Sequence, residues 1–427
     1  MADATLVLKG GRVVDEAGSR DADVAIAADG TIAAVGPGLD GGRVLDCSGC
    51  VVGPGLVDLH SHLRQPGLEE AETIETGSRA AALGGYTAVV AMPNTTPAID
   101  SAGVVREVLE LARTALCDVH PAGAITKERA GTELAPMAEM AALGVRLFTD
   151  DGAGVQDSRL MRRALEYASA LGVTLAQHCE DAGLSTGGYM HEGEWSSRLG
   201  IPGQPAEAEE LMVARDIALC RLTKAPVHFL HLSTAGSVAL VRAARAEGLP
   251  VTAEAAPHHF TLTDAAVATY DPVFKVHPPL RTDVDVAAVK AGLTDGTIDA
   301  IATDHAPHTL ESKEAAFDEA PPGMIGLETA LPLALGELGL PIEAVLGLLS
   351  WRPARIAGLA DAHGGPVVEG RRANLCVIDP AATWVVDAAA MASRSRNTPY
   401  AGRKVTGRVR HTLLRGEPVV VDAEAQR

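Results

Sequence analysis

The feature that most constrains the fold of this chain is an alternation of short apolar segments with alanine-rich helical segments between residues 54 and 362. The apolar segments have the length of buried strands rather than of helices. The eight candidate strands are Leu56–Leu59, Ala88–Met92, Ala122–Thr126, Arg146–Thr149, Thr174–Gln177, Val227–Leu230, Val251–Ala255 and Ala300–Thr303. Helical segments between them include Thr73–Leu83, Ser158–Leu171, Ala206–Arg221 and Gly236–Glu247. Because strand and helix alternate through eight strands, we predict an α/β fold with a parallel (β/α)8 barrel.

An open, doubly wound parallel sheet is the main alternative to the barrel. Such a sheet usually has a glycine-rich phosphate-binding sequence after its first strand, whereas this chain has the residues His-Ser-His-Leu-Arg at positions 60–64. Residues two apart on an extended backbone point to the same side, so His60 and His62 can direct both imidazoles at one point. A His-x-His pair is common by chance, and a strand end with two surface histidines is an equally good interpretation of it alone.

The two ends of the chain have a different pattern, in which apolar and polar residues alternate over short runs separated by Gly-Gly, Asp-Gly and Pro-Gly turns. This pattern indicates antiparallel strands joined by hairpins. The runs are Thr5–Leu8, Arg12–Val14, Asp23–Ile26, Thr31–Val35 and Arg43–Asp46, then Ala373–Ile378, Thr383–Val386, Lys404–Val409 and Pro418–Val421. Since neither end offers a convincing core alone, we predict one small β-sandwich-like domain from residues 1–53 and 363–427, beside a barrel of residues 54–362.

Composition excludes several classes of function. The 427 residues carry a net charge of −19 without a block of like charges, so neither nucleic acid nor an anionic membrane is an expected partner. No signal peptide is visible in residues 1–10 and no apolar run reaches the length of a membrane span, so we expect a cytoplasmic protein. The six cysteines are scattered, and the Cys47 and Cys50 pair is interpreted as a chance C-x-x-C because no second pair accompanies it.

Polar side chains occur at the ends of the candidate strands, where the functional groups of a barrel collect. In chain order they are His60, His62, Asn94, Asp150, Asp151, His178, His231, Asp304, His305 and His308. Imidazoles and carboxylates suit zinc, which takes three or four protein ligands. One histidine at a strand end is more often a hydrogen-bonded structural residue. Four histidines and two aspartates from five strands make that interpretation poor.

Six candidate ligands exceed what one ion needs, so we favour a binuclear zinc site over a mononuclear one. The predicted ligands are His60, His62 and Asp304 for one ion, and His178 and His231 for the other. Asp151 would bridge the ions with its two carboxylate oxygens, whereas Asp150 is less suitable because adjacent strand residues face opposite sides. A hydroxide between the ions would be the nucleophile, and Asp304 would accept its proton and pass it to the leaving nitrogen.

Two segments, residues 55–67 and residues 302–313, closely resemble the signature stretches of dihydroorotases of the amidohydrolase superfamily. Residues 91–97, 148–152 and 326–332 resemble the class I (long-chain) branch, and the likeness extends to residues 395–402, so it covers nearly the whole chain. The resemblance implies a cytosolic enzyme of de novo pyrimidine (UMP) synthesis. Its reaction would be the reversible cyclisation of N-carbamoyl-L-aspartate to (S)-dihydroorotate plus water.

The resemblance also implies the substrate contacts, which are His62, Arg64, Asn94, His277, His308, Pro322 and Gly323. A planar guanidinium such as that of Arg64 can bind the substrate carboxylate through two hydrogen bonds, and Asn94 and His308 can add donors. Alternatively, Arg64 is a surface ion-pair partner and Asn94 a turn residue. His277 stands where the family is expected to have asparagine. The long segment His308–Gly326, helical in pattern only over Glu311–Phe317, predicts a lid.

Two other functions stay open. Relatives that open hydantoins, dihydropyrimidines or allantoin typically bridge their metals with a carbamylated lysine on the fourth strand. This chain has Asp150 and Asp151 there, and no lysine between Lys127 and Lys224. A non-catalytic subunit that scaffolds aspartate transcarbamoylase would have lost metal ligands, and none is missing here. A homodimer and a complex with aspartate transcarbamoylase are consistent with the resemblance, although no motif indicates either. His258 and His259 are interpreted as supporting or structural residues.

Overall fold

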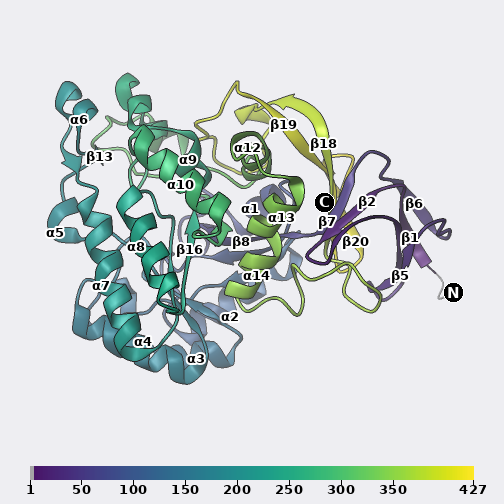
Figure 1. The fold of residues 1–427 in the computed structure, drawn as a ribbon, viewed down its shortest axis with the longest axis horizontal. Coiled ribbons are helices and arrows are strands. Elements are labelled where there is room, and N and C mark those ends of the chain that lie inside the picture. Colours follow the sequence, from purple (N-terminus) through teal and green to yellow (C-terminus); the bar gives the residue numbers. More distant parts are fainter. Residues whose placement is uncertain (1–3) are drawn as a thin grey trace.

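The computed structural model describes residues 4–427 and contains a closed barrel of eight parallel strands surrounded by helices (Figure 1). The strands are β8 (Leu56–Ser61), β9 (Tyr86–Ala91), β10 (Asp118–Pro121), β11 (Leu147–Phe148), β12 (Thr174–Gln177), β15 (Val227–Phe229), β16 (Val251–Ala255) and β17 (Ala300–Ile301). They form two ladders, β10-β9-β8 and β11-β12-β15-β16-β17. Parallel bridges from Ser61 to His305 and from Gly123 to Phe148 join the ladders into a ring. The predicted barrel is thus confirmed. The expectation about a signal peptide concerned residues 1–10, and residues 1–3 of that segment lie outside the described residues.

Helices begin where the sequence provides side-chain caps. Helix α1 (Ile74–Leu83) follows Thr73, α4 (Ser158–Leu171) follows Asp157, and α8 (Ala235–Ala246) follows Thr234. Each of these side chains accepts a backbone N–H of the first helical turn, which helices otherwise leave unpaired. The other helices include α2 (Ala102–Leu111), α3 (Met137–Ala142), α7 (Glu207–Thr223), α9 (Pro257–Thr261), α10 (Asp283–Asp295), α12 (Ala330–Glu337), α13 (Ile342–Leu346) and α14 (Arg352–Ile356). The four predicted helices agree with α1, α4, α7 and α8 to within two residues at each end.

The third barrel strand lies earlier in the chain than predicted. Strand β10 spans Asp118–Pro121 and pairs with β9 from Asp118 opposite Ala88 to Pro121 opposite Ala91, whereas the prediction was Ala122–Thr126. Val119 packs into the core between strands and helices, so its neighbours Asp118 and His120 face the barrel interior. Strand β10 lacks the apolar run that identifies a buried strand, because two of its residues are polar and face inward and its last residue is a proline.

Strands from both ends of the chain form two sheets beside the barrel (Figure 1). One sheet has the order β5-β4-β1-β6 and the other the order β21-β20-β19-β18-β7-β2-β3. The N-terminal strands are β1 (Ala4–Lys9), β2 (Arg12–Asp15), β3 (Gly18–Asp21), β4 (Asp23–Ala27), β5 (Ile32–Gly36), β6 (Arg43–Asp46) and β7 (Val51–Pro54). The C-terminal strands are β18 (Leu375–Val385), β19 (Lys404–Leu414), β20 (Glu417–Val421) and β21 (Glu424–Ala425). Most pairs in these sheets are antiparallel, as predicted, but β1 with β6 and β2 with β7 are parallel.

One apolar core connects these two sheets. It contains Leu8, Val24 and Ile32 from the N-terminal segment, and Val377 and Leu413 from the C-terminal segment, all of them buried. Strand β18 pairs with β7 on one side and β19 on the other, so the two ends of the chain share one sheet. From this shared core we propose the division into residues 1–53 with 363–427 and residues 54–362.

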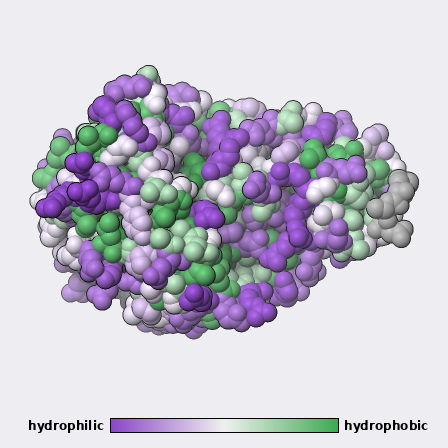
Figure 2. All heavy atoms as spheres, turned by 90° about the horizontal axis from the view of Figure 1, so that it is seen from below, coloured by the Kyte–Doolittle hydropathy of each residue, from purple (hydrophilic) through white to green (hydrophobic). Residues whose placement is uncertain are grey.

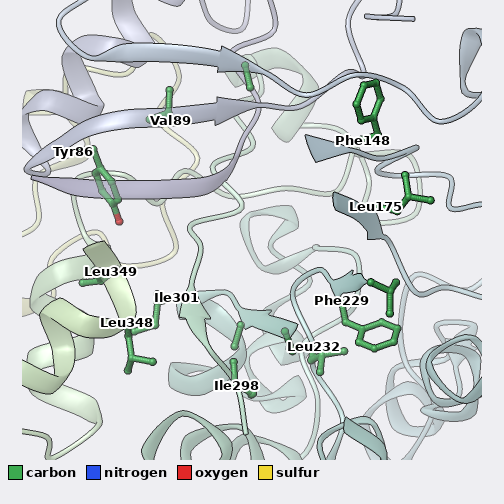
Figure 3. Packing of buried hydrophobic residues seen from close by; sticks show 14 of the residues in the cluster. Tyr86, Val89, Phe148, Leu175, Phe229, Leu232, Ile298, Ile301, Leu348 and Leu349 are labelled. Carbon is green, nitrogen blue, oxygen red and sulfur yellow. The ribbon is translucent and has the colours of Figure 1, made fainter. Parts of the chain in front are cut away.

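The largest core lies between the barrel strands and the outer helices (Figure 3). Phe148 of β11, Leu175 of β12 and Phe229 of β15 lie near one another there and are fully buried. Burial of each such side chain contributes about 1.5–3 kcal/mol. A second, smaller cluster with several alanines, including Ala122, Ala176 and Ala300, occupies the barrel interior. This packing on both faces fixes the strand ends that carry the polar residues.

None of the helices within residues 4–427 combines the length and the apolar character needed to cross a bilayer. Hydrophilic and apolar residues are interspersed on the face shown in Figure 2. Some large apolar side chains are more than half exposed, among them Leu211 and Leu222 on α7 and Val284 on α10. Scattered apolar side chains of this kind are normal on protein surfaces and do not indicate a binding site.

Candidate metal centre and substrate cavity

The six predicted metal ligands lie together at the carboxyl ends of the barrel strands. His60 belongs to β8 and His62 follows it, while the others follow β11, β12, β15 and β17 and are Asp151, His178, His231 and Asp304. All six side chains are buried. The closed barrel therefore brings residues that are up to 244 positions apart (60 to 304) into one cluster.

The carboxylate of Asp151 lies at the centre of the cluster. Its Oδ1 atom is 3.3 Å from Nε2 of His60, and its Oδ2 atom is 3.5 Å from Nε2 of His62. The same Oδ1 atom is also 3.4 Å from Nδ1 of His178 and 3.5 Å from Nε2 of His231. Asp151 thus faces both pairs of histidines, as a bridging ligand must.

Asp304 lies beside the first of these two pairs, His60 and His62. Its Oδ1 atom is 3.1 Å from Nε2 of His62 and 3.5 Å from Nε2 of His60. Burial alone would raise the pKa of Asp304, but the hydrogen bond with His62 and the surrounding imidazoles hold it well below its usual range. The carboxylate is therefore ionised at neutral pH.

The cluster has the spacing and the unpaired atoms of a metal site. Zinc bonds of about 2.0–2.1 Å at tetrahedral angles separate ligand atoms by about 3.3–3.4 Å, close to the separations around Asp151. Among the described residues, the buried atoms Nε2 of His60 and Oδ1 of Asp151 have no hydrogen-bond partner. Two ligand groups, His60 with His62 and His178 with His231, share Asp151. The residues therefore fit two cations joined by one carboxylate.

Electrostatics also favours positive charge in this cluster. Burial lowers the pKa of His60, but the nearby carboxylate of Asp151 and the hydrogen bond with Glu254 raise it well above its usual value. A buried histidine that is driven toward its protonated form by acidic neighbours occupies a site where a cation is stabilised. Nδ1 of His178 and Nε2 of His231 are only 3.0 Å apart, which fits two ligands of one ion.

Three further side chains orient the histidines. Nδ1 of His60 donates to Glu254 at 3.0 Å, and Nδ1 of His62 donates to Oδ1 of Asn94 at 2.8 Å. Nε2 of His178 lies 3.3 Å from Glu180. Each contact leaves the other ring nitrogen directed at Asp151, the arrangement typical of metal-binding histidines.

The predictions omitted Glu254 and Glu180 from the site. Burial raises the pKa of Glu254, but hydrogen bonds from His228 and His60 lower it to about 2. A sequence signal was present, because Glu254 is a charged residue within the buried strand β16, and such a residue requires a buried partner. For Glu180, the only signal was its position two residues after His178.

Asp150 faces away from the cluster. Its Oδ1 atom accepts the backbone N–H groups of Ile125 at 2.8 Å and Thr126 at 3.0 Å, and the Thr126 hydroxyl donates to Oδ2. Asp150 and Asp151 thus point in opposite directions, and the chain turns directly after Asp150.

The backbone is unusual at three site residues. Arg64, His231 and Asp304 have φ angles of 61°, 30° and 46°, a region that favours glycine. Each such conformation costs about 1–3 kcal/mol and persists only where surrounding contacts impose it. Beside Asp304, the buried carboxylate of Asp58 accepts the Thr303 N–H at 2.7 Å and so fixes the end of β17 against β8.

A cavity of about 230 Å³ opens beside the metal cluster. All seven predicted substrate contacts line it, namely His62, Arg64, Asn94, His277, His308, Pro322 and Gly323. Asp151, His178, His231 and Asp304 also reach its wall, whereas His60 is not among the lining residues. The cavity therefore lies directly against both halves of the cluster.

Arg64 is buried in this wall rather than exposed as a surface ion-pair partner. Its Nε atom donates to the Pro307 carbonyl at 3.1 Å, and Nη2 lies 3.3 Å from Nε2 of His308. Burial, with the charge of Arg64, lowers the pKa of His308 to about 3. The neutral imidazole of His308 donates from Nε2 to the Pro322 carbonyl at 2.8 Å, a contact between two residues of the predicted lid.

His277, the predicted departure from the family pattern, has polar neighbours. Its Nε2 atom lies 3.3 Å from Nε2 of Gln204, and Nδ1 lies 3.9 Å from Glu180. Because the Gln204 amide nitrogen is a donor, Nε2 of His277 is the acceptor. Burial lowers the pKa of His277, so its imidazole is neutral, with the proton on Nδ1.

Two neighbouring segments complete the surroundings. Nε2 of His258 lies 3.8 Å from Asp304, and Nε2 of His259 donates to the Pro278 carbonyl at 3.0 Å. In the predicted lid, helix α11 covers only Leu310–Lys313, shorter than the helical pattern over Glu311–Phe317. The Thr309 side chain caps the amino-terminal end of this helix, and Glu314 is the residue at which the helix ends.

Comparisons with known proteins agree on one family. Residues 49–237 match the family model described as "Dihydro-orotase-like". The dihydroorotase of Pelotomaculum thermopropionicum is 50% identical over 426 residues, which is 98% of this chain and 99% of that protein. The dihydroorotase of Streptomyces coelicolor is 49% identical over 428 residues, with 98% and 99% covered.

Solved structures with the same fold include hydantoinases. The L-hydantoinase (dihydropyrimidinase) of Arthrobacter aurescens superimposes with a TM-score of 0.89 at 25% identity and covers 99% of this chain and 98% of its own. The D-hydantoinase of Thermus sp. has a TM-score of 0.84 at 26% identity, with 98% and 96% covered. The names of the sequence relatives and of the structural neighbours thus indicate different activities.

Proposed function

This chain belongs to the dihydroorotase family, and from that premise we propose that it catalyses the reversible cyclisation of N-carbamoyl-L-aspartate to (S)-dihydroorotate plus water. The observation that carries the proposal is the metal cluster around Asp151, which adjoins a cavity that also contains Arg64. A carboxylate substrate needs both an anion-binding group and a polarising centre, and these two groups share one wall.

We infer that the cluster binds two zinc ions. His60, His62 and Asp304 would hold one, His178 and His231 the other, and Asp151 both. When bound, the ions would supply an activated water at neutral pH and would polarise the amide carbonyl. The donor set of imidazoles and carboxylates suits zinc, and its unpaired buried atoms support this inference.

The chain's own residues would bind the substrate and move the proton. Arg64 would bind the substrate carboxylate through its guanidinium. Asn94 accepts from His62 through Oδ1, so its amide nitrogen stays available to donate to the substrate. Asp304, which is ionised, would accept a proton from the attacking water and donate it to the ring nitrogen that leaves. His277, His308, Pro322 and Gly323 would enclose the substrate.

Hydantoinase activity is the second candidate, because the structural neighbours bear that name. The bridging residue distinguishes the two. Among the residues that line the cavity in the described part of the chain there is no lysine that carbon dioxide could convert to a carbamate. Asp151 carries its two oxygens already. We therefore expect apo-protein given zinc to recover activity at the same rate with and without bicarbonate.

The test is a parallel assay with dihydroorotate, hydantoin and allantoin. Turnover of dihydroorotate far above that of the other two is the expected result. Preference for hydantoin together with a bicarbonate requirement would contradict the proposal. A protein that binds metal but turns over none of the three would instead fit the non-catalytic scaffold. Cytoplasmic localisation, a homodimer and a complex with aspartate transcarbamoylase stay predictions.

A further inference from the structure

A second cluster of potential metal ligands lies at the other end of the barrel. Asp118 is the first residue of β10, His120 lies two positions further on the same face, and His363 lies in the segment after α14. One ligand atom from each lies within 4.8 Å of the other two, the same limit that the two groups around Asp151 meet. The cluster thus combines two residues of β10, at the amino-terminal end of the barrel, with one residue from a distant segment of the chain.

The three side chains lie close to one another. Nε2 of His363 lies 3.1 Å from Oδ2 of Asp118. The rings of His120 and His363 meet edge to face, with centroids 5.9 Å apart and planes at 81°. Nε2 of His120 is a buried atom and, among the described residues, has no hydrogen-bond partner. A buried unpaired ring nitrogen is costly unless water or a cation satisfies it.

The surroundings of His363 hold its ring in place beside Asp118. Its Nδ1 atom lies 3.1 Å from the Thr87 hydroxyl and 3.4 Å from the Asn374 amide nitrogen, and its Nε2 atom faces Asp118. The ring therefore offers Nε2 to the cluster, and a cation there would replace the proton that His363 shares with Asp118.

The geometry points to a third metal site, at which Asp118, His120 and His363 bind a divalent transition-metal ion such as zinc. Two imidazoles and one carboxylate form a donor set that zinc, cobalt and nickel accept. Three protein ligands leave one or more positions to water. The ion would join β10 to the segment after α14 and so close the amino-terminal end of the barrel.

Arg415 makes this site weaker than the cluster around Asp151. Its guanidinium donates to Oδ1 of Asp118, and its positive charge opposes a cation on Oδ2. The side chain of Arg415 is 57% exposed, so solvent screens this charge and the side chain can move away. The new site has one carboxylate, whereas the other cluster has two. We therefore expect its ion to exchange readily and to be removed by mild chelation before the ions at Asp151.

The test compares zinc binding by wild type and His120→Gln in equilibrium dialysis against buffered free zinc. Wild type is expected to bind one zinc ion per chain more than His120→Gln, with the same rate on dihydroorotate. His411→Gln, which removes a buried histidine outside both clusters, is the matched control and should bind as much zinc as wild type. Arg415→Gln should bind the additional ion at lower free zinc, because the competing charge is gone.

Thermal unfolding provides a readout that is independent of activity. Zinc added after the Asp151 cluster is saturated should raise the Tm of wild type and leave that of His120→Gln unchanged, because only wild type binds the additional ion. If His120→Gln does not fold, Asp118→Asn takes its place in both measurements. Equal zinc content in wild type and a folded variant at every free zinc concentration would overturn the proposal. So would loss of the ion together with loss of activity, which would place the effect at the Asp151 cluster.

Discussion

At the scale of single residues, the site depends on which ring nitrogen of each histidine carries its proton. Nδ1 of His60 and Nδ1 of His62 both donate to oxygen atoms, so Nε2, which faces the carboxylates, is the ring nitrogen that would bind a cation in each. His178 is reversed, since its Nδ1 faces Asp151 and its Nε2 faces Glu180. The neighbours of each imidazole therefore select the tautomer that a cation requires.

The adjacent aspartates give a prediction with an internal control. Asp151→Asn should lose at least one of the two ions and lower kcat/KM by at least about 10²-fold, because a neutral amide cannot bridge two cations well. Asp150→Asn should keep its metal content and lose about 1–3 kcal/mol of stability, because the Thr126 hydroxyl loses a charged acceptor. Metal analysis and urea unfolding measure both effects. The opposite pattern would show that Asp150 is the bridge.

Arg64 gives a second prediction at this scale. Arg64→Lys keeps the positive charge and loses the planar pair of donors, so kcat/KM for dihydroorotate should fall by about 10²-fold or more. The metal content should stay that of wild type, since Arg64 is not a ligand. Arg113→Lys, at an exposed ion pair with Glu110, is the control and should have no effect. An unchanged kcat/KM in Arg64→Lys would exclude a role in substrate binding.

At the scale of elements, the segment after β17 is held over the cavity by two buried lysines. Nζ of Lys313 donates to the carbonyls of Pro272 at 2.9 Å and Pro321 at 2.8 Å. Nζ of Lys275 donates to the Asp318 carbonyl at 2.9 Å. These contacts connect the predicted lid to the segment around His277. Lid closure itself stays a prediction, which slower hydrogen exchange of residues 308–326 with bound dihydroorotate would support.

Lys313 also gives a prediction about pH. Burial, with the charge of Lys275, lowers its pKa to about 7, whereas a lysine in the unfolded chain titrates at 10.5. Between these values the unfolded chain binds more protons at this position, so the contribution of Lys313 to stability rises with pH and is smallest below pH 7. In urea unfolding, Lys313→Met should reduce the slope of the unfolding free energy by up to about 1.4 kcal/mol per pH unit in this window. Lys404→Met, at an exposed position, should keep the wild-type slope.

At the scale of the whole molecule, the two ends of the chain depend on each other. Strand β18 lies between β7 and β19, so the seven-stranded sheet needs residues from both ends. The sheet also contacts the barrel, because the Thr412 hydroxyl of β19 donates to the Ala82 carbonyl of α1 at 2.7 Å. The core that stabilises the end sheets nevertheless contains none of the residues of the metal cluster at the carboxyl ends of the barrel strands.

This separation predicts a stability effect without a catalytic one. Leu413 is fully buried in the core shared by both sheets, so Leu413→Ala should lower the free energy of unfolding by about 2–5 kcal/mol. At a temperature where the variant is folded, kcat and metal content should equal those of wild type. Leu222→Ala, at a side chain that is 60% exposed, should change stability by less than about 0.5 kcal/mol. A reduced kcat in folded Leu413→Ala would show that the sheets support the site.

The sequence by itself determined the fold class and the family. Apolar strands that alternate with helices predict a barrel because each strand is buried on both faces, and this signal is local. The same alternation predicted that polar residues after the strands, such as His178 and Asp304, would meet at one end. Their roles stay predictions, yet their meeting follows from parallel strands alone.

Only the tertiary structure decided the contacts between residues that are far apart in the chain. Glu254 orients His60 by binding Nδ1, the imidazole nitrogen that faces away from Asp151, and no local pattern indicates that pair. Strand β10 escaped prediction because its inward residues, Asp118 and His120, are polar. Their partner His363 lies more than 240 residues further along the chain, so only the closed barrel brings the three side chains together. Local periodicity specifies which face a residue occupies, whereas the packing of the whole chain decides what lies opposite it.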